Sequence, residues 1–404
     1  MISLTQAHRD IVSLQPLEAV VISLDKALGL VCSEDVYARS SCPSVDSSVK
    51  DGFAVVADDI DCATETCPVE LSVVGALMAG DGDDSLQVTK GNAVRIMTGA
   101  PVPDGATSVV ASEFTEQRGS RVVVRADARV GRNILLKGSD IKRGQLLLVK
   151  GTLLRPALLG LLAAAGIGSL ACHRLPRVAI AATGSELVWP GEEVTPGKVA
   201  ASNMVTAQAE LKRLGIDASV HIVRDNLDGL EAQFKELVEN VDVLITCGGV
   251  LDGDKDLTMK AMERLGMEKI FHRVRIGPGK GACLGRLGAT VVFNLPGGPP
   301  SNHVALILLA LPGCRRLMGF GNCLPVQRSV VVQEELSGQH GWTQLVYSRV
   351  RFEKDLAVAV PLYKLGRLEA MGAANALVLL PEDCKVLKAG EHATAWILDS
   401  SDAL

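Results

Sequence analysis

Short apolar runs alternate with amphipathic segments through residues 174–320, and this alternation constrains the fold more than any other feature of the chain. Runs of β-branched residues such as 241–246 predict buried strands, and apolar residues at helical spacing between Asn203 and Gly215 predict a helix that ends at the glycine. The pattern continues with strands at 177–182, 218–223, near 270–276 and 289–294, and with helices around 230–238, 257–265 and 301–311. It predicts a doubly wound, mostly parallel sheet covered by helices on both faces. Ligands of such sheets bind beyond the carboxyl ends of the strands.

The rest of the 404-residue chain predicts further domains on either side of this α/β domain, 174–320. Residues 46–144 carry short valine-rich runs between Gly, Asp and Pro turns, which predicts an antiparallel β domain. Helical segments are expected on both sides of it, at 5–13, at 23–28 and from 155 to 165. Residues 1–45 and 145–173 therefore predict a helical stalk into which the β domain is inserted. The short runs of residues 321–404 predict a C-terminal β barrel.

Composition excludes several classes of protein. The net charge is −5 and no basic block occurs, which argues against nucleic acid as the partner. The apolar run 157–172 is too short and too rich in Gly and Ala to span a bilayer, and the amphipathic N-terminal segment with Asp10 does not resemble a signal peptide. The 10 cysteines include no CxxC pair, which fits reduced thiols in the cytoplasm.

One strand of the α/β domain leads directly into glycines and acids. The apolar run 241–246 is followed by Gly248-Gly249 and then by Asp252, Asp254 and Asp256. Glycines let the backbone turn sharply and approach a ligand closely. A solvated acidic turn is the alternative for this stretch alone. Calcium is disfavoured because Leu257 stands where a calcium loop of this spacing needs glycine.

Similar loops occur at other predicted strand ends. They are Thr183-Gly184-Ser185-Glu186, Gly248-Gly249-Val250, Gly277-Pro278-Gly279-Lys280 and Leu295-Pro296-Gly297-Gly298-Pro299-Pro300-Ser301. Exposed backbone N–H groups, Lys280 and the helix start at Ser301 favour an anion such as phosphate. Glu186 and Asp256, on neighbouring loops, are suited to a divalent cation that bridges to phosphate oxygens. Each loop taken singly could be an ordinary tight turn, but several converging loops predict a site.

The inserted β domain contributes three more polar segments. They are residues 46–54, 94–106 and 137–141, and they contain Asp51, Thr98 and Asp140. Turn formation explains the Gly and Pro residues of these segments, but it does not explain those three polar side chains.

In collinear order over nearly the whole chain, these segments resemble the MoeA-type molybdopterin molybdenumtransferases, the family that includes the E domain of gephyrin. The most specific match is VRIMTGAPVPDGA at 94–106, and the others are DGFAV, KGSDI, TGSEL with PGK and SN downstream, GGV with Asp256, PGK and LPG. The resemblance implies a helical stalk, an inserted β domain, a molybdopterin-binding α/β domain and a C-terminal β barrel. It also implies a homodimer whose site lies between the α/β domain of one subunit and the inserted and barrel domains of the other.

The activity implied by the resemblance is insertion of molybdate into adenylylated molybdopterin with Mg²⁺-dependent release of AMP. Carried over by position, the catalytic residues are Asp51, Thr98, Asp140, Glu186 and Asp256. Asp256, with Asp140 or Glu186, is expected to hold the cation, and Asp51 to orient water or molybdate. The expected molybdopterin-binding residues are Thr183, Gly184, Ser185, Gly248, Gly249, Val250, Pro278, Gly279, Lys280, Pro296, Gly297 and Ser301. Further implied partners are the molybdopterin adenylyltransferase and apo-molybdoenzymes.

The sequence departs from the family pattern at several positions, which indicates a divergent subfamily. Leu251 follows GGV where serine is usual, Gly277 precedes PGK where lysine is usual, and Leu365-Gly366 stands where the barrel usually carries a Gly-Ser-Gly segment. A charge-assisted hydrogen bond contributes roughly 1.5–3 kcal/mol, so these losses weaken the expected anion pocket. Tungstate as substrate, or a non-catalytic molybdopterin carrier or scaffold, therefore remain alternatives. An unrelated phosphate-ester enzyme would require the collinear motifs to be coincidental.

Overall fold

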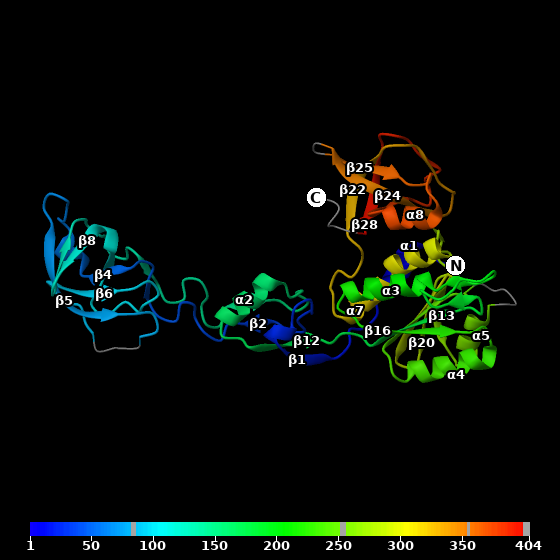
Figure 1. Cartoon of the computed structure of the whole chain (residues 1–404), viewed down its shortest axis with the longest axis horizontal. Helices are drawn as coiled ribbons and strands as arrows, with labels where there is room; N and C mark the ends of the chain where they lie inside the picture. The colour runs from blue at the N-terminus through cyan, green and yellow to red at the C-terminus, as the bar shows by residue number, and fades with distance from the viewer. Residues whose placement is uncertain (82–85, 251–255, 354–355, 399–404) are drawn as a thin grey trace.

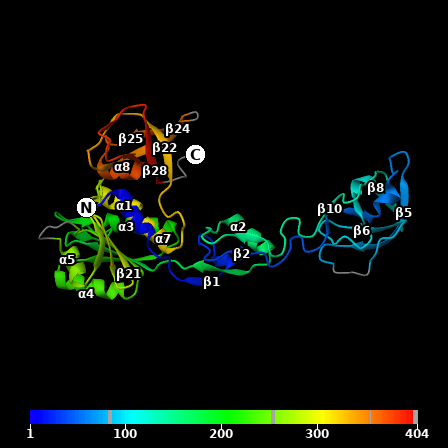
Figure 2. The same cartoon turned by 180° about the vertical axis from the view of Figure 1, so that it is seen from behind.

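The computed structural model describes residues 1–81, 86–250, 256–353 and 356–398. The molecule is elongated, with the inserted β domain at one end, the stalk in the middle, and the α/β domain and barrel together at the other end (Figure 1). The view from behind shows the same order (Figure 2). The predicted architecture of an α/β domain combined with β domains is confirmed.

The α/β domain is a sheet with the strand order β16-β13-β17-β21-β20-β18. Its elements are β13 (Val178–Thr183), β14 (Leu187–Val188), β15 (Val199–Ala200), α3 (Ser202–Arg213), β16 (Ala218–Val223), α4 (Leu227–Val238), β17 (Val243–Cys247), α5 (Leu257–Arg264), β18 (Glu268–His272), β20 (Cys283–Leu287), β21 (Thr290–Leu295), α6 (Pro299–Ala305) and α7 (Leu311–Leu317). The pairings from β16 through β13 and β17 to β21 are parallel, as predicted, whereas β20 runs antiparallel to both β21 and β18. β20 was not predicted from the sequence, because Gly285 and Arg286 interrupt its apolar run.

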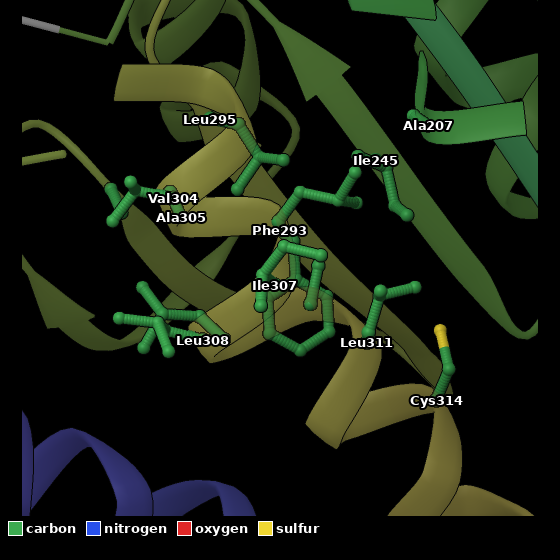
Figure 3. Packing of buried hydrophobic residues seen from close by; sticks show 14 of the residues in the cluster. Ala207, Ile245, Phe293, Leu295, Val304, Ala305, Ile307, Leu308, Leu311 and Cys314 are labelled. Atoms are coloured by element: carbon green, nitrogen blue, oxygen red, sulfur yellow. The ribbon is translucent and has the colours of Figure 1, made fainter. Parts of the chain in front are cut away.

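Helices cover both faces of this sheet. Side chains of α3, α6, α7 and α1 (Leu4–Val12) pack on one face, and α4 and α5 pack on the other. On the first face, Phe293 of β21 lies among side chains of the α6–α7 segment, including Ile307, Leu308 and Leu311 (Figure 3). A Cβ at Gly313 would lie 2.3 Å from Cζ of Phe293, so this glycine lets α7 approach the sheet closely. The predicted helix 301–311 is longer than expected: it begins at Pro299, includes a π-helical turn at Leu306–Ala310 and continues to Leu317.

The stalk contains more strand than predicted. Its elements are β1 (Ala19–Ser23), β2 (Val36–Tyr37), β11 (Leu146–Leu148), α2 (Pro156–Ala164) and β12 (Ser169–His173). The helices expected at 5–13 and after Arg155 are confirmed as α1 and α2, although α1 packs on the α/β sheet and not in the stalk. The helix expected at 23–28 is wrong. That segment is the end of β1 followed by a single 3₁₀ turn, Leu24–Lys26. β1 pairs antiparallel with β12, which follows the inserted domain in sequence, so this strand depends on a distant partner and was not predicted from its local pattern.

The inserted domain is a sheet with the order β7-β4-β6-β5-β9-β8. Its strands are β3 (Ser47–Ser48), β4 (Gly52–Val55), β5 (Val69–Leu77), β6 (Asn92–Ile96), β7 (Ser108–Ala111), β8 (Thr115–Arg118), β9 (Arg121–Val124) and β10 (Ile134–Leu135). The expectation of a purely antiparallel domain is wrong, because β5 and β6 pair in parallel. A run of alternating residues predicts a strand but not the direction in which that strand pairs.

The C-terminal barrel is closed, as predicted. Its elements are β22 (Gln327–Val332), β23 (Leu336–Ser337), β24 (Thr343–Glu353), β25 (Leu356–Pro361), α8 (Arg367–Ala373), β26 (Ala376–Leu380), β27 (Val386–Leu387) and β28 (His392–Ile397). The order β24-β25-β22-β28-β26 closes through pairing of β26 with β24. β19 (Ile276–Gly277), which belongs in sequence to the α/β domain, pairs in parallel with β24. This pairing attaches the barrel to the α/β domain beside one of the predicted ligand loops.

Candidate active site

A pocket of about 910 Å³ lies where the loops beyond the carboxyl ends of β17 and β21 meet the barrel. The predicted residues that line it are Gly249, Val250, Asp256, Pro278, Gly279, Lys280, Pro296, Gly297 and Ser301. Among the described lining residues, Asp256 and Lys280 carry the charges. Three of the four predicted loops therefore form one pocket of a size suited to a cofactor-sized ligand. Asp252 and Asp254, which the sequence analysis also noted, lie outside the described residues, as does Leu251.

The loop at 277–280 reaches this pocket by a different topology from the one predicted. We expected it to follow the carboxyl end of a parallel strand, but it lies between β19 and the antiparallel strand β20. The beginning of an antiparallel strand lies at the same edge of the sheet as the ends of its parallel neighbours. The predicted position of Lys280 is thus correct although the predicted strand direction is not.

The fourth loop, Thr183-Gly184-Ser185-Glu186, follows β13. It is hydrogen-bonded to the segment that begins α5, next to the pocket. Thr258 Oγ1 donates a hydrogen bond of 3.0 Å to Thr183 Oγ1, and both side chains are buried. Gly248 lies against this pair, since a Cβ there would be 2.7 Å from the carbonyl oxygen of Thr183. The carboxylate of Glu186 folds back over Gly184. Thr258 belongs to the first turn of α5, and Asp256 is the residue at that helix's N-cap, so the loops that carry the two acids are held together.

Asp225 is a site candidate that the sequence analysis missed. It follows the end of β16, accepts a hydrogen bond from the backbone N–H of Ser185 (3.2 Å), and its own N–H donates to Ser185 Oγ (3.1 Å). Lys198 Nζ donates to the carbonyl oxygen of Ser185 at 2.7 Å. Asp225 could have been predicted, because it lies two residues beyond the predicted strand 218–223 and ligands of such sheets bind beyond the carboxyl ends of the strands.

The barrel of the same chain also lines the pocket through Gln339, Trp342 and Gln344. The ammonium of Lys280 lies 5.3 Å from the centre of the Trp342 ring, a cation–π contact that holds the lysine over the pocket. A Cβ at Gly277 would lie 2.8 Å from Oε1 of Gln344, so the glutamine occupies the space that a side chain at position 277 would need. No local sequence signal pointed to these residues, because only the packing of barrel on sheet brings them there.

Asp51 and Thr98 form a second polar cluster in the inserted domain. Thr98 donates to Asp51 Oδ1 from both its backbone N–H (2.7 Å) and its hydroxyl (2.8 Å). These bonds lower the pKa of Asp51 and keep it a carboxylate, with Arg95 and Lys50 adding to the effect. A small pocket of about 280 Å³ lies beside Asp51 and is also lined by Arg95 and Gln117.

The predicted acids do not form one cluster within the chain. Asp140 is exposed and lies where the inserted domain joins the stalk, since its N–H donates to the carbonyl oxygen of Cys42 (3.1 Å) and the next residue, Ile141, belongs to the stalk core. The inserted domain itself, with Asp51 and Thr98, lies at the opposite end of the molecule from the α/β domain that carries Glu186 and Asp256 (Figure 1). Among residues 1–81, 86–250, 256–353 and 356–398, no group of three or more His, Cys, Asp or Glu side chains is arranged to hold a metal. Within one chain, the proposed metal ligands are therefore reduced to Glu186 and Asp256, on neighbouring loops.

Comparison with known proteins identifies the family. The family model described as "MoeA N-terminal region (domain I and II)" matches residues 2–166, and the one described as "Probable molybdopterin binding domain" matches residues 179–316. A molybdopterin molybdenumtransferase of Staphylococcus aureus is 30% identical over 96% of this chain and 93% of its own length. The chain belongs to the MoeA family. A Staphylococcus epidermidis enzyme of the same name is also 30% identical, over 94% of this chain and 91% of its own.

Solved MoeA structures have the same fold. A molybdopterin biosynthesis MoeA protein from Pyrococcus horikosii has a TM-score of 0.84 at 30% identity, with 99% of this chain and 100% of that chain covered. A second Pyrococcus MoeA structure gives 0.80 at 25% identity, with 98% and 100% covered. In this MoeA-family chain, the 910 Å³ pocket is lined by residues of the region that matches the family model "Probable molybdopterin binding domain", together with residues of the barrel. No helix in the described part of the chain has the length and apolar character needed to cross a bilayer.

Proposed function

We propose that this MoeA-family enzyme inserts molybdate into adenylylated molybdopterin and releases AMP. The observation that carries the proposal is the pocket at the sheet edge, which glycine-rich loops, Lys280 and Asp256 line together in the region that matches a probable molybdopterin binding domain. A phosphate-bearing ligand and a doubly charged oxyanion both need closely approaching backbone and a fixed cation. The glycine-rich loops supply the closely approaching backbone. Lys280 supplies the fixed cation, and its cation–π contact with Trp342 holds it in place.

Glu186 and Asp256 are the residues proposed to hold Mg²⁺. Mg²⁺ in phosphate-handling enzymes takes one or two carboxylates and completes its shell with substrate phosphates and water, which two acids on neighbouring loops fit. When bound, the ion would neutralise charge that develops as the phosphoanhydride breaks. The predicted alternative ligand, Asp140, lies where the stalk joins the inserted domain, outside the α/β domain that carries both acids.

Asp51, Thr98 and Asp140 are proposed to act from a second subunit. Asp51 and Thr98 lie at the far end of the molecule from the 910 Å³ pocket, and Asp140 lies where the inserted domain joins the stalk. A homodimer in which the inserted domain of one subunit covers the pocket of the other would unite the two sets of residues. In that arrangement Asp51, held as a carboxylate by Thr98, would orient water or molybdate. We further propose a cytoplasmic enzyme that exchanges its ligands with a molybdopterin adenylyltransferase and with apo-molybdoenzymes.

A non-catalytic molybdopterin carrier or scaffold is the second candidate function. It is favoured by Gly277, because Gln344 occupies the place of a second positive side chain and leaves Lys280 as the lysine that lines the pocket among the described residues. Glycine in place of the usual lysine at position 277 also changes the charge around the anion, which makes tungstate an alternative substrate to molybdate.

The deciding experiment incubates the full chain with adenylylated molybdopterin, Mg²⁺ and molybdate and measures AMP release. Asp256→Ala serves as the inactive control, and Asp383→Ala, an acid of the barrel that does not line the pocket, serves as the matched control. Molybdate-dependent release that is lost only in Asp256→Ala is the expected result, and a parallel series with tungstate determines the preferred oxyanion. Tight binding of the substrate without AMP release would replace the catalytic proposal by the carrier.

A further inference from the structure

A second pocket, of about 870 Å³, lies between the α/β domain and the barrel and shares no described lining residue with the candidate active site. Helices α3 and α7 border it on one side and strands β22 and β28 on the other (Figure 1). Its walls are mainly apolar, with Ile307, Leu311, Val330, Val350 and Ile397 among them. A volume of this size is in the range of pockets that enclose small organic ligands.

Arg315 gives this apolar pocket a specific polar group. It lines the pocket from α7 and is half-buried, and its guanidinium has no hydrogen bond or ion pair with any other residue in the described part of the chain. Burial lowers the pKa of Arg315, because few groups around it replace the water that would solvate its charge. A guanidinium held in this way is set up to form paired hydrogen bonds with a carboxylate.

The other charged residues that line the pocket are either paired with each other or exposed at its rim, so Arg315 is the cation of its interior. Glu210 and Arg213, both on α3, lie 3.5 Å apart as an ion pair. Arg328 and His392 lie on the exposed rim. Glu210, the single acid among the described lining residues, pairs with Arg213 and also attracts Arg315. One acid against these two arginines leaves about one net positive charge, which suits a ligand with one anionic group.

We propose that this interdomain pocket binds a small amphipathic carboxylate, with the carboxylate on the Arg315 guanidinium and the apolar body against Ile307, Leu311 and Val330. The site is separate from the molybdopterin pocket and does not depend on the proposed transferase activity. Because its walls come from both the α/β domain and the barrel, a bound ligand would also hold these two domains together.

The test measures binding of octanoate to the full chain by calorimetry, with octanamide as the neutral ligand of the same shape. Saturable one-to-one binding of octanoate is expected, and at least tenfold weaker binding of octanamide. Arg315→Met is expected to weaken octanoate at least tenfold. Arg316→Met is the matched control, because Arg316 carries the same charge on the same helix but is bonded to the carbonyl oxygen of Leu14 and does not line the pocket.

A second variant keeps the proposal testable if Arg315→Met fails to fold. Ser329 is exposed and lines the pocket on β22, so Ser329→Trp is expected to fold and to block octanoate binding by filling space. Equal affinities for octanoate and octanamide would overturn the proposal, as would unchanged binding in a folded Arg315→Met or Ser329→Trp variant. Absence of saturable octanoate binding at millimolar concentration would also overturn it.

Discussion

Gly249 lies at a turn of the backbone that lines the candidate active-site pocket. Its φ is +63°, and a Cβ there would lie 2.4 Å from Oγ1 of Thr258, which is the hydroxyl that joins this loop to Thr183. Gly266, just after α5, also has a positive φ (+82°), but a Cβ there would meet no atom within 4 Å. The two glycines thus share a backbone requirement and differ in what surrounds them.

We expect Gly249→Ala to reduce kcat/KM for AMP release by at least tenfold, because the added methyl displaces Thr258 and the loop that it holds. Gly266→Ala should lower stability by about 1 kcal/mol through backbone strain alone and leave kcat/KM within about twofold. The comparison requires melting temperatures and steady-state kinetics for both variants. Equal kinetic defects in the two variants would show that the contact with Thr258 is unimportant.

Trp342 offers a test of how the barrel supports Lys280. Trp342→Leu removes the ring that lies under the ammonium at 5.3 Å, and an exposed cation–π contact contributes roughly 0.5–1 kcal/mol, so the KM for molybdate should rise about two- to fivefold. Trp342→Phe keeps an aromatic face and should retain most of the affinity. If the Leu variant binds as well as the Phe variant, the ring acts only as packing.

At the scale of elements, a carboxylate links the stalk to the central sheet. Asp242, immediately before β17, accepts hydrogen bonds of 2.6 and 2.8 Å from the guanidinium of Arg174, which follows the stalk strand β12. Arg177 also donates to it, from its backbone N–H at 2.8 Å. Burial by itself would raise the pKa of Asp242, but these hydrogen bonds outweigh it and hold the pKa well below its usual range.

A carboxylate with a lowered pKa stabilises the fold above its unfolded pKa of about 3.9, and this stabilisation is lost as the pH falls toward the folded value. Asp242→Asn should therefore lower the free energy of unfolding by about 3 kcal/mol at pH 7, and its difference from the wild type should shrink below about pH 4. Urea unfolding between pH 7 and pH 3.5 measures this. Glu116→Gln is the control, since Glu116 also contacts two arginines but is exposed, and its effect should be much smaller. If the difference in unfolding free energy between the wild type and Asp242→Asn did not change with pH, the lowered pKa assigned to Asp242 would be contradicted.

At the scale of the whole molecule, the two groups of predicted site residues lie at opposite ends of one chain (Figure 1). If a homodimer unites them, Asp51→Ala and Asp256→Ala should complement each other, because a mixed dimer contains one site with both acids intact. Random exchange of subunits would restore roughly a quarter of the wild-type AMP release. Mixing Asp256→Ala with Lys280→Ala should restore nothing, since both residues belong to the same pocket and every mixed site would carry one defect.

Complementation by the first pair alone would support the shared site, and size-exclusion chromatography should show a dimer. Failure of the Asp51→Ala and Asp256→Ala pair, with subunit exchange verified by differently tagged chains, would mean that Asp51 is not part of the same catalytic site.

Much of this protein follows from the sequence, because local patterns report local structure. The parallel strands β13, β16, β17 and β21 were predicted near their observed positions, and so were the barrel strands, from apolar runs at 329–333, 345–352, 357–362, 376–380 and 393–398. Burial on a sheet imposes apolar and β-branched runs that are visible in the chain. The glycine-rich loops were identifiable for the same reason: a turn beside a ligand restricts which residues fit there. These loops, with Asp256 and Lys280, line the pocket as expected.

Tertiary structure alone decided the features that depend on pairing between distant segments. The pairing of β1 with β12, the parallel pairing of β5 with β6 and the antiparallel β20 each depend on a partner strand that the local pattern does not specify. The same holds for Trp342 and Gln344, which enter the pocket because β19 pairs with β24, and for the pocket around Arg315, whose two walls come from different domains. A side chain's chemistry is fixed by the sequence, but its neighbours are fixed by contacts whose free energy is gained only when the whole chain has folded.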